Sequence, residues 1–278
     1  MTITAAQVNE LRNLTGAGLM DCKKALTEAG GDVQKAIDFL RKKGAKVAEL
    51  RAGRAAAEGV VVAKTSSDNK KGVAVYLSCE TDFVAKNEEF VKLANAIADA
   101  ALAAGSKTAE EVLELSLGTA KVKDAVQEKV SAIGELINVS SFSSLEGESV
   151  VAYNHMGNKI GVLVALNKGL NDAVATTGKD IAMQIAAMNP LAVDAAGVSP
   201  EVLAREKTIA LEKAAASGKP ANILEKIAES AVNSYLKENT LLTQPFVKDG
   251  SKNVAQVLAS TESGLTVTAF KRVERGAK

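Results

Sequence analysis

One pattern of two strands followed by a helix occurs twice in this sequence, and it constrains the fold more than any other feature. In the first copy, the β-branched runs 58–65 and 72–80 flank the polar loop SSDNKK, which predicts a hairpin. Residues 88–104 then place Phe90, Leu93, Ala94, Ile97 and Ala101 on one helical face. The second copy has strand-like runs at 149–155 and 159–167 and an amphipathic helix at 172–188.

The two copies also share residues. Gly72-Val-Ala-Val-Tyr-Leu77 aligns with Gly161-Val-Leu-Val-Ala-Leu166, and 161 minus 72 gives an offset of 89. Ile97-Ala98 matches Ile185-Ala186 one residue out of that register. A recurring unit of this kind predicts two related subdomains, each a small antiparallel sheet covered by helices. Because the shared residues are common apolar types, coincidence is the alternative.

The segment before the first copy is predicted to be purely helical. Thr4 and Gln7 form a capping-box pattern, and the first helix stops at Thr15-Gly16. A second helix runs to Gly30-Gly31, and a third ends before Gly44. These three short helices resemble a ubiquitin-associated type of bundle, and residues 45–57 are expected to form a helical or frayed connector.

The fold class is therefore α+β, with three predicted units. Residues 1–54 form the three-helix module and connector, residues 55–147 the first subdomain and residues 148–278 the second. Ser199-Pro200-Glu201 starts a long helix, since Pro suits the first helical turn. Gly218-Lys-Pro220 breaks it, which predicts a projecting helical hairpin over about 199–238. Further expected elements are helices near 108–116, 119–134 and 252–260 and strands at 136–145 and 265–273.

Composition excludes several classes of protein. The chain has 278 residues and a formal net charge of +1, which argues against long-range attraction to nucleic acid or membrane. Residues 1–54 carry 10 basic against 6 acidic side chains, or +4, so an RNA- or ribosome-binding adaptor acting through this module stays as the alternative function. No apolar run reaches the roughly 20 residues that span a bilayer, so a cytoplasmic protein is expected.

Enzyme motifs give little. Gly16-Ala-Gly18 lacks the third glycine of a dinucleotide fingerprint, and no GxxxxGK[ST] pattern is present. Cys22 and Cys79, with one histidine, are too few for a zinc site and are expected to be half-buried reduced thiols. Glu80 and Asp82 could form an acid/base pair in a small hydrolase, but carboxylates on a turn are more often solvated. We therefore predict no catalytic residues, no metal and no cofactor.

Thr81-Asp82-Phe83-Val84 is the unusual local feature, because it lies between a strand and a helix. Thr81 or Asp82 can cap the following turn by accepting backbone N–H bonds, which would present Phe83 at a tip. From the pattern alone, a Phe at such a turn more often packs into its own core. If it projects instead, burying its ring in a partner contributes about 1.5–3 kcal/mol.

Two long motifs carry a resemblance to a known family. The run from Leu11 to Leu26, LRNLTGAGLMDCKKAL, and the run from Cys79 to Lys86, CETDFVAK, resemble the two signatures of the elongation factor Ts family. The likeness continues through further runs, which cover nearly the whole chain: 132–138, 153–164, 217–220 and 242–247. Ser78 departs from the pattern, where the family usually has Asn, so the fine geometry of that loop is not carried over.

The resemblance implies a guanine-nucleotide exchange factor that is not itself an enzyme. Its partner would be elongation factor Tu, bound in the cytoplasm without direct nucleic-acid or membrane contact; a homodimer or a 2:2 complex is left open. The segment Thr81-Asp82-Phe83-Val84 would intrude beside the Mg²⁺ site of elongation factor Tu and release GDP. Further partner contacts carried over from the family are Leu19, Met20, Lys23, Ile133, Gly134 and His155. For His155 a purely structural role is the alternative.

Overall fold

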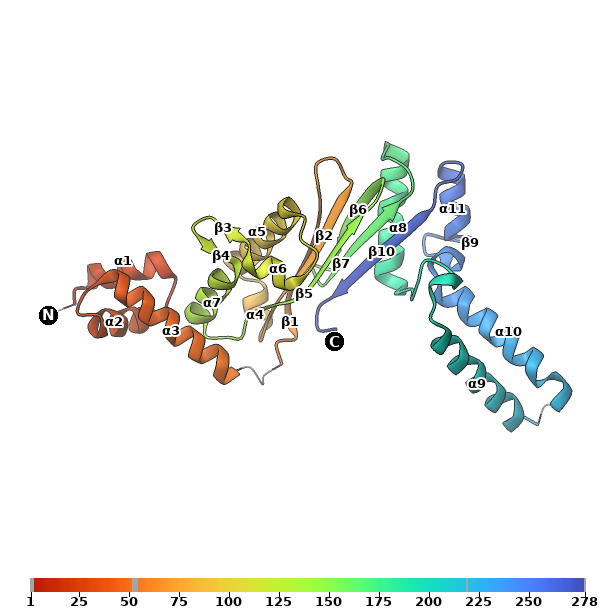
Figure 1. Ribbon diagram of the computed structural model, residues 1–278, viewed down its shortest axis with the longest axis horizontal. Helices are drawn as coiled ribbons and strands as arrows, with labels where there is room; N and C mark the ends of the chain where they lie inside the picture. The colour runs from red at the N-terminus through yellow and green to blue at the C-terminus, as the bar shows by residue number, and fades with distance from the viewer. Residues whose placement is uncertain (1–2, 52–54, 219, 278) are drawn as a thin grey trace.

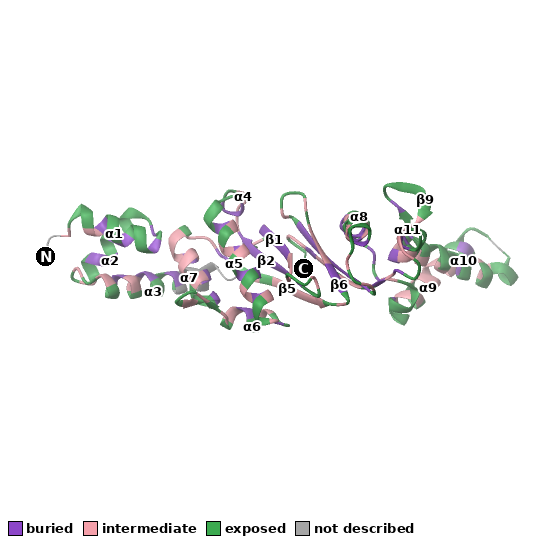
Figure 2. Ribbon diagram, turned by 90° about the horizontal axis from the view of Figure 1, so that it is seen from above, coloured by how far each residue is buried: buried purple, intermediate pink, exposed green. Residues whose placement is uncertain are grey.

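The molecule is elongated, with a helical bundle at one end, two sheets in the middle and a helical hairpin at the other (Figure 1). The computed structural model describes residues 3–51, 55–218 and 220–277. Buried residues concentrate in the central strands, whereas both ends of the molecule are largely exposed (Figure 2). The α+β class is confirmed. The unit boundaries after residues 54 and 147 stay a prediction.

The N-terminal bundle consists of α1 (Ala5–Thr15), α2 (Leu19–Glu28) and α3 (Val33–Arg51). The predicted capping box is present, because the Thr4 hydroxyl accepts from the backbone N–H of Gln7 and the Gln7 side chain accepts from that of Thr4. The apolar stripes of the three helices meet in one small core. Its fully buried members include Leu11, Cys22, Ala25, Leu26 and Ala36.

The prediction that the third helix ends before Gly44 is wrong. Helix α3 continues through Gly44 to Arg51, so it includes part of the predicted connector; residues 52–54 of that connector lie outside the described residues. Gly44 is buried where α3 crosses α7 (Val122–Ile133). A Cβ built on Gly44 would lie 1.5 Å from Ser131 Oγ. The glycine therefore permits close packing of the two helices rather than ending one of them.

The first sheet has the strand order β1-β2-β5 and is antiparallel. Its strands are β1 (Glu58–Thr65), β2 (Lys71–Cys79) and β5 (Asn138–Glu146). One face packs against α5 (Glu88–Ala104), with α6 (Ala109–Glu114) and α7 completing the cover. Both predicted strands of the hairpin are confirmed to within a residue.

The second sheet has the strand order β10-β7-β6 and repeats this arrangement. Its strands are β6 (Ser149–His155), β7 (Ile160–Leu166) and β10 (Val267–Glu274). One face packs against α8 (Asp172–Met188), and α11 (Val254–Thr261) lies beside that helix. In both sheets the second strand of the hairpin is central, and a strand from much later in the chain pairs with it.

The two sheets also pack on each other through their inner faces. Side chains of the central strands alternate between two cores: Val73 and Val75 face the helices, while Ala74 and Tyr76 face the other sheet. The repeated glycines lie at this contact. A Cβ on Gly72 would lie 2.8 Å from Val150 Cγ1, and one on Gly161 would lie 2.7 Å from Val61 Cγ1. The shared glycine of the two copies therefore has a packing reason.

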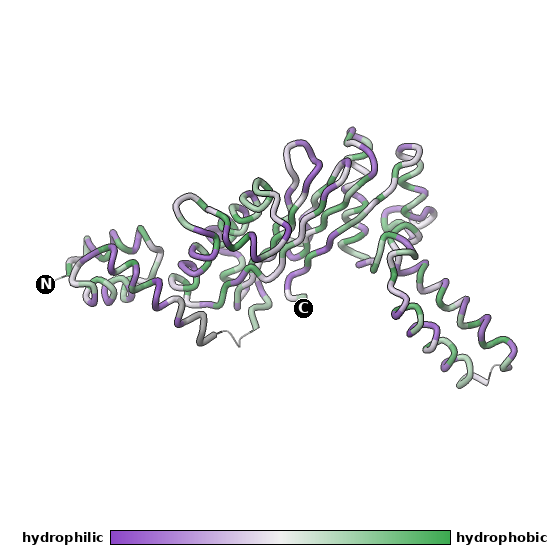
Figure 3. Tube along the Cα trace, viewed as in Figure 1, coloured by the Kyte–Doolittle hydropathy of each residue, from purple (hydrophilic) through white to green (hydrophobic). Residues whose placement is uncertain are grey.

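The predicted helical hairpin is formed by α9 (Pro200–Ala216) and α10 (Ala221–Asn239); residue 219 of its turn lies outside the described residues. Hydrophobic and hydrophilic bands alternate along both helices (Figure 3). At its base the N–H of Leu191 donates to Asn239 O, and the N–H of Leu241 donates to Ala192 O, each at 2.9 Å. Short elements that the sequence did not predict are α4 (Asp82–Ala85), β3 (Ser116–Leu117), β4 (Ala120–Lys121), η1 (Ala195–Gly197), η2 (Leu241–Thr243), β8 (Pro245–Phe246) and β9 (Asp249–Asn253).

Candidate functional site

The segment between β2 and α5 forms a turn that is capped twice. Thr81 Oγ1 accepts from the Val84 N–H at 3.4 Å at the start of α4, as an N-cap residue does. Asn87 Oδ1 then accepts from the N–H groups of Glu89 at 2.9 Å and Phe90 at 3.3 Å at the start of α5. Two caps six residues apart leave this short segment little conformational freedom.

Phe83 projects from this turn, with 83% of its surface exposed. The inward positions of α4 are taken by Val84 and Ala85, which join the core between the first sheet and its helices. The aromatic ring that fills this core belongs to Phe90, which is fully buried. Of the segment predicted as an intruding site, Phe83 therefore lies outside the fold, and Val84 anchors it.

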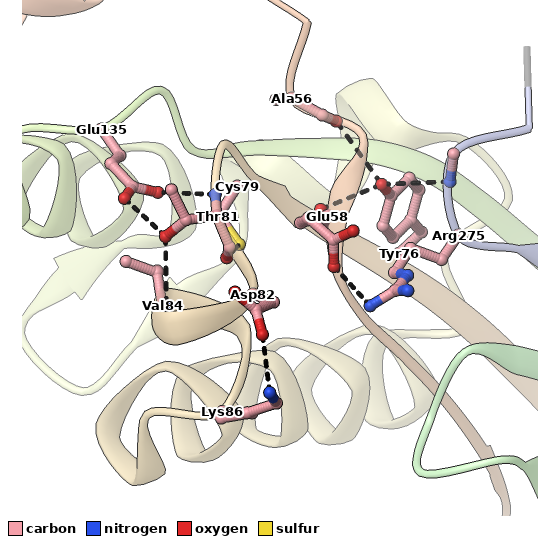
Figure 4. A network of polar contacts seen from close by, with 11 residues as sticks. Ala56, Glu58, Tyr76, Cys79, Thr81, Asp82, Val84, Lys86, Glu135 and Arg275 are labelled. Atoms are coloured by element: carbon pink, nitrogen blue, oxygen red, sulfur yellow. Dashed lines mark hydrogen bonds and ion pairs between the residues drawn. The ribbon is translucent and has the colours of Figure 1, made fainter.

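Asp82 and Lys86 form an ion pair on the outer side of α4, with Nζ and Oδ2 2.6 Å apart (Figure 4). The hydrogen bond from Lys86 holds the pKa of the Asp82 carboxyl below its usual value. The carboxylate is thus charged at neutral pH and stands next to the exposed Phe83 ring in the sequence. Both members of the pair are exposed, so a partner can approach them directly.

A second carboxylate fixes the turn from the side of β5. Glu135 Oε2 accepts from the N–H groups of Glu80 at 3.1 Å and Thr81 at 3.0 Å. Its Oε1 accepts from the Thr81 hydroxyl at 2.7 Å, and Figure 4 shows the contacts between Glu135 and Thr81. In return, Glu80 Oε1 accepts from the Leu136 N–H at 2.8 Å. The structure thus joins two sequence motifs that lie more than 50 residues apart. Glu135 was not among the predicted site residues, although it lies within one of the motifs.

These contacts do not support the acid/base alternative. The Glu80 carboxylate is directed to the backbone of Leu136, and the Asp82 carboxylate is directed to Lys86. Cys79 is fully buried, and that burial raises the pKa of its thiol to about 12, so it is a poor nucleophile. The expectation that Cys22 and Cys79 are half-buried is wrong, since both are fully buried and free.

The N-terminal bundle presents the other predicted apolar contacts. Leu19 and Met20 begin α2 and are exposed to 48% and 72%. Lys23 is exposed one turn further along the same helix. Asp21, between them, forms an ion pair with Lys43 of α3 at 2.5 Å, which ties α2 to α3. The bundle therefore offers an apolar tip with an exposed lysine side chain beside it.

The remaining predicted residues lie at the ends of α7 and β6. Ile133 is 36% exposed at the last position of α7, and Gly134 ends the helix with φ +80°. They directly precede Glu135, so the structure brings them to the turn that carries Phe83. His155 ends β6, where its Nδ1 lies 2.8 Å from the Tyr153 hydroxyl. The bundle residues are on α2, in the helical bundle at one end of the molecule (Figure 1). That bundle packs against α7, where a Cβ on Gly16 would lie 3.9 Å from Ala132 Cβ.

Nothing in the described part of the chain forms a group of three or more His, Cys, Asp or Glu side chains suited to a metal ion. Among the same residues, each helix is too short or too polar to cross a membrane. What the site offers is exposed apolar side chains on capped elements, beside charged groups. Such an arrangement is typical of a protein-binding factor that contacts its partner through apolar anchor residues.

Comparison with known proteins gives the family. A family model described as Elongation factor TS matches residues 80–277. A protein named Elongation factor Ts from Amoebophilus asiaticus is 49% identical over 277 residues and covers 100% of both chains. Proteins of the same name from Christiangramia forsetii and Cytophaga hutchinsonii are 46% and 47% identical and cover 99% and 98% of each chain. The chain belongs to the elongation factor Ts family, which assigns it to translation elongation in protein biosynthesis.

Proposed function

We propose that this chain is the guanine-nucleotide exchange factor of a translational GTPase, elongation factor Tu, and releases GDP from it without being an enzyme. The observation that carries the proposal is the 83% exposure of Phe83 on a turn fixed by two caps and by Glu135. An aromatic ring held outside its own fold exposes apolar surface to water, which is unfavourable unless a partner buries it. We also propose that the factor acts in the cytoplasm.

The chemistry follows from how a GTPase holds its nucleotide. Mg²⁺ and backbone N–H groups around the phosphates supply most of the contact, so small displacements of those groups remove strong electrostatic interactions. The Phe83 ring would enter between elements of the partner, and the charged Asp82 carboxylate would disturb the surroundings of the metal. Every 1.4 kcal/mol of differential destabilisation weakens nucleotide binding about tenfold.

The other exposed groups would hold the partner while the ring intrudes. Leu19, Met20 and Lys23 would bind its nucleotide-binding domain, and Ile133, Gly134 and His155 would add contacts near the turn. Because coupling between two ligands is reciprocal, bound nucleotide must weaken the factor as much as the factor weakens nucleotide. Rebinding of GTP would therefore release the factor for another cycle.

The test is release of a fluorescent GDP analogue from elongation factor Tu. Removing the ring in Phe83→Ala should slow release roughly ten- to a hundredfold, since burial of a Phe side chain is worth about 1.5–3 kcal/mol. The midpoint of urea unfolding should stay nearly unchanged, because the ring is exposed in the free chain. Phe83→Leu, which keeps much of the apolar volume, should fall between the two.

A matched control is Val247→Ala, which shortens another exposed apolar side chain, 47% exposed, between β8 and β9. This variant should release GDP at the rate of the unaltered chain. An unchanged release rate in Phe83→Ala, measured with a correctly folded variant, would remove the ring from the mechanism.

A further inference from the structure

We infer that Glu135 is a positioning residue for Phe83: its carboxylate orders the turn from Glu80 to Phe83 so that the ring is presented outward before any partner binds. The inference rests on the proposed function, because it gives a role in exchange to a residue that need not touch the partner. It is carried by the three hydrogen bonds that this one side chain accepts from the turn.

Two of these bonds satisfy backbone donors at the place where the strand stops. Cys79 is the last residue of β2 in register with β1, opposite Glu58, and the N–H groups of Glu80 and Thr81 follow it. Both donate to the same oxygen of Glu135, at 3.1 and 3.0 Å. Hydrogen bonds to an ionised acceptor are shorter and stronger than those between neutral groups. The Glu135 carboxylate therefore holds the backbone of Glu80 and Thr81 in place beyond the end of β2.

The third bond concerns the Thr81 hydroxyl, which caps α4. The Thr81 hydroxyl has a single proton, and it points to Glu135 Oε1 at 2.7 Å. Its oxygen is then free to accept from the Val84 N–H, which starts α4. Glu135 thus acts on the first turn of α4, which contains Phe83.

The outward direction of the ring follows from what the turn is fastened to. Glu80 returns a hydrogen bond to the Leu136 N–H at 2.8 Å, so the two segments hold each other by one carboxylate in each direction. Val84 is buried on the inner side of α4, and Leu136 is buried next to Glu135. With the turn fixed from both of these sides, the side chain between Asp82 and Val84 is left facing solvent.

The fluorescence of an introduced tryptophan provides a local probe, because the chain itself contains no Trp. In Phe83→Trp the single indole reports the mobility of the tip through its fluorescence anisotropy in the free chain. Glu135→Ala should lower that anisotropy and should reduce the maximal rate of GDP release about tenfold, as expected if the presented conformation falls to about a tenth of the population. Affinity for elongation factor Tu·GDP should change much less, because Leu19, Met20 and Lys23 are not altered.

Two variants separate positioning from a general loss of structure. Glu135→Gln keeps the length and one carbonyl oxygen for the two backbone donors, so it should restore both the anisotropy and most of the maximal rate. If Glu135→Ala folds poorly, Thr81→Val takes its place in the test. It removes the hydroxyl while leaving Glu135 unchanged, and it should lower the anisotropy and the maximal rate as expected for Glu135→Ala. The control is Glu114→Ala, which removes a carboxylate that pairs with Lys121 and Lys123 on the surface, away from the turn.

Three results would overturn the inference. The first is a folded Glu135→Ala chain whose anisotropy equals that of its parent, and the second is a lowered anisotropy with a normal maximal rate of GDP release. The third is a Glu135→Gln variant as impaired as Glu135→Ala. Failure of the proposed function looks different. In that case Phe83→Ala itself releases GDP normally, while the anisotropy comparison still reports whether Glu135 orders the turn; the link from that order to exchange is then refuted.

Discussion

Gly44→Ala separates two opposing effects at the contact between α3 and α7. In an exposed helix, replacing an interior Gly by Ala stabilises by about 1 kcal/mol. Here the new Cβ would lie 1.5 Å from Ser131 Oγ and 2.7 Å from Ser131 Cβ. A serine rotamer change can move Oγ, but Cβ moves only with the backbone of α7. Normal carbon contacts are about 3.5–4.0 Å, so the helices must separate by close to 1 Å.

The expected result is therefore a loss of stability. Overpacking of this kind costs about 1–3 kcal/mol, which offsets the gain in helix propensity of about 1 kcal/mol and leaves a net destabilisation of up to about 2 kcal/mol. Urea unfolding followed by circular dichroism measures it; if the bundle unfolds separately, the effect should fall on that transition. The exchanged pair Gly44→Ala with Ser131→Gly should recover most of the loss, because the clashing atoms are gone.

A stability gain of about 1 kcal/mol in the single variant would refute this reasoning, since it would mean that α3 and α7 do not pack as closely as the structure has them. Ser131→Gly alone is the matched control. It should lose about 0.5 kcal/mol through helix propensity without relieving any clash.

Two further predictions concern titratable groups. Cys79, whose pKa is raised to about 12 by burial, should resist a thiol reagent at pH 8 in the folded chain and react on unfolding; rapid native-state labelling that Cys79→Ser abolishes would contradict this. Hydrogen bonds from Lys121 and Lys123 lower the pKa of Glu114 from 4.5 to about 2, so their stabilising effect should be complete above about pH 4.5 and lost as the pH falls toward 2; an NMR titration with its midpoint near 4.5 would show that the pairs do not form in solution.

Much of this architecture could be predicted from the sequence because its elements are strongly periodic. The bounds of β1, α5 and α8 coincide with the predicted ranges 58–65, 88–104 and 172–188. The caps at Thr4 and Thr81 could also be predicted, since capping patterns act over three residues and do not depend on distant parts of the chain. The strands β3, β4 and β8 were missed because two-residue strands have no periodicity to detect. The five residues of β9, DGSKN, were missed because they contain no apolar or β-branched side chain.

What could not be predicted depends on contacts between distant residues. Gly44 has the residue type that ends helices, and only the approach of Ser131 shows why it lies inside one. The pattern around Phe83 favoured an inward ring, but Phe90 fills that core, and Val84 takes the inner position. Glu135 carries no signal as a single residue; its role depends on its place beside Thr81, 54 positions away in the chain.

The base of the helical hairpin has a consequence for how this fold can vary. Backbone bonds between Leu191 and Asn239 and between Ala192 and Leu241 close the chain on itself before α9 begins and after α10 ends. Because its two ends are held together, the hairpin acts on the rest of the chain as a short loop would. Strand β10 therefore reaches its place beside β7 whatever the hairpin contains. Lengthening, shortening or replacing the hairpin would change how far the molecule reaches while leaving the strand register intact, so this end of the protein is free to diversify independently of its core.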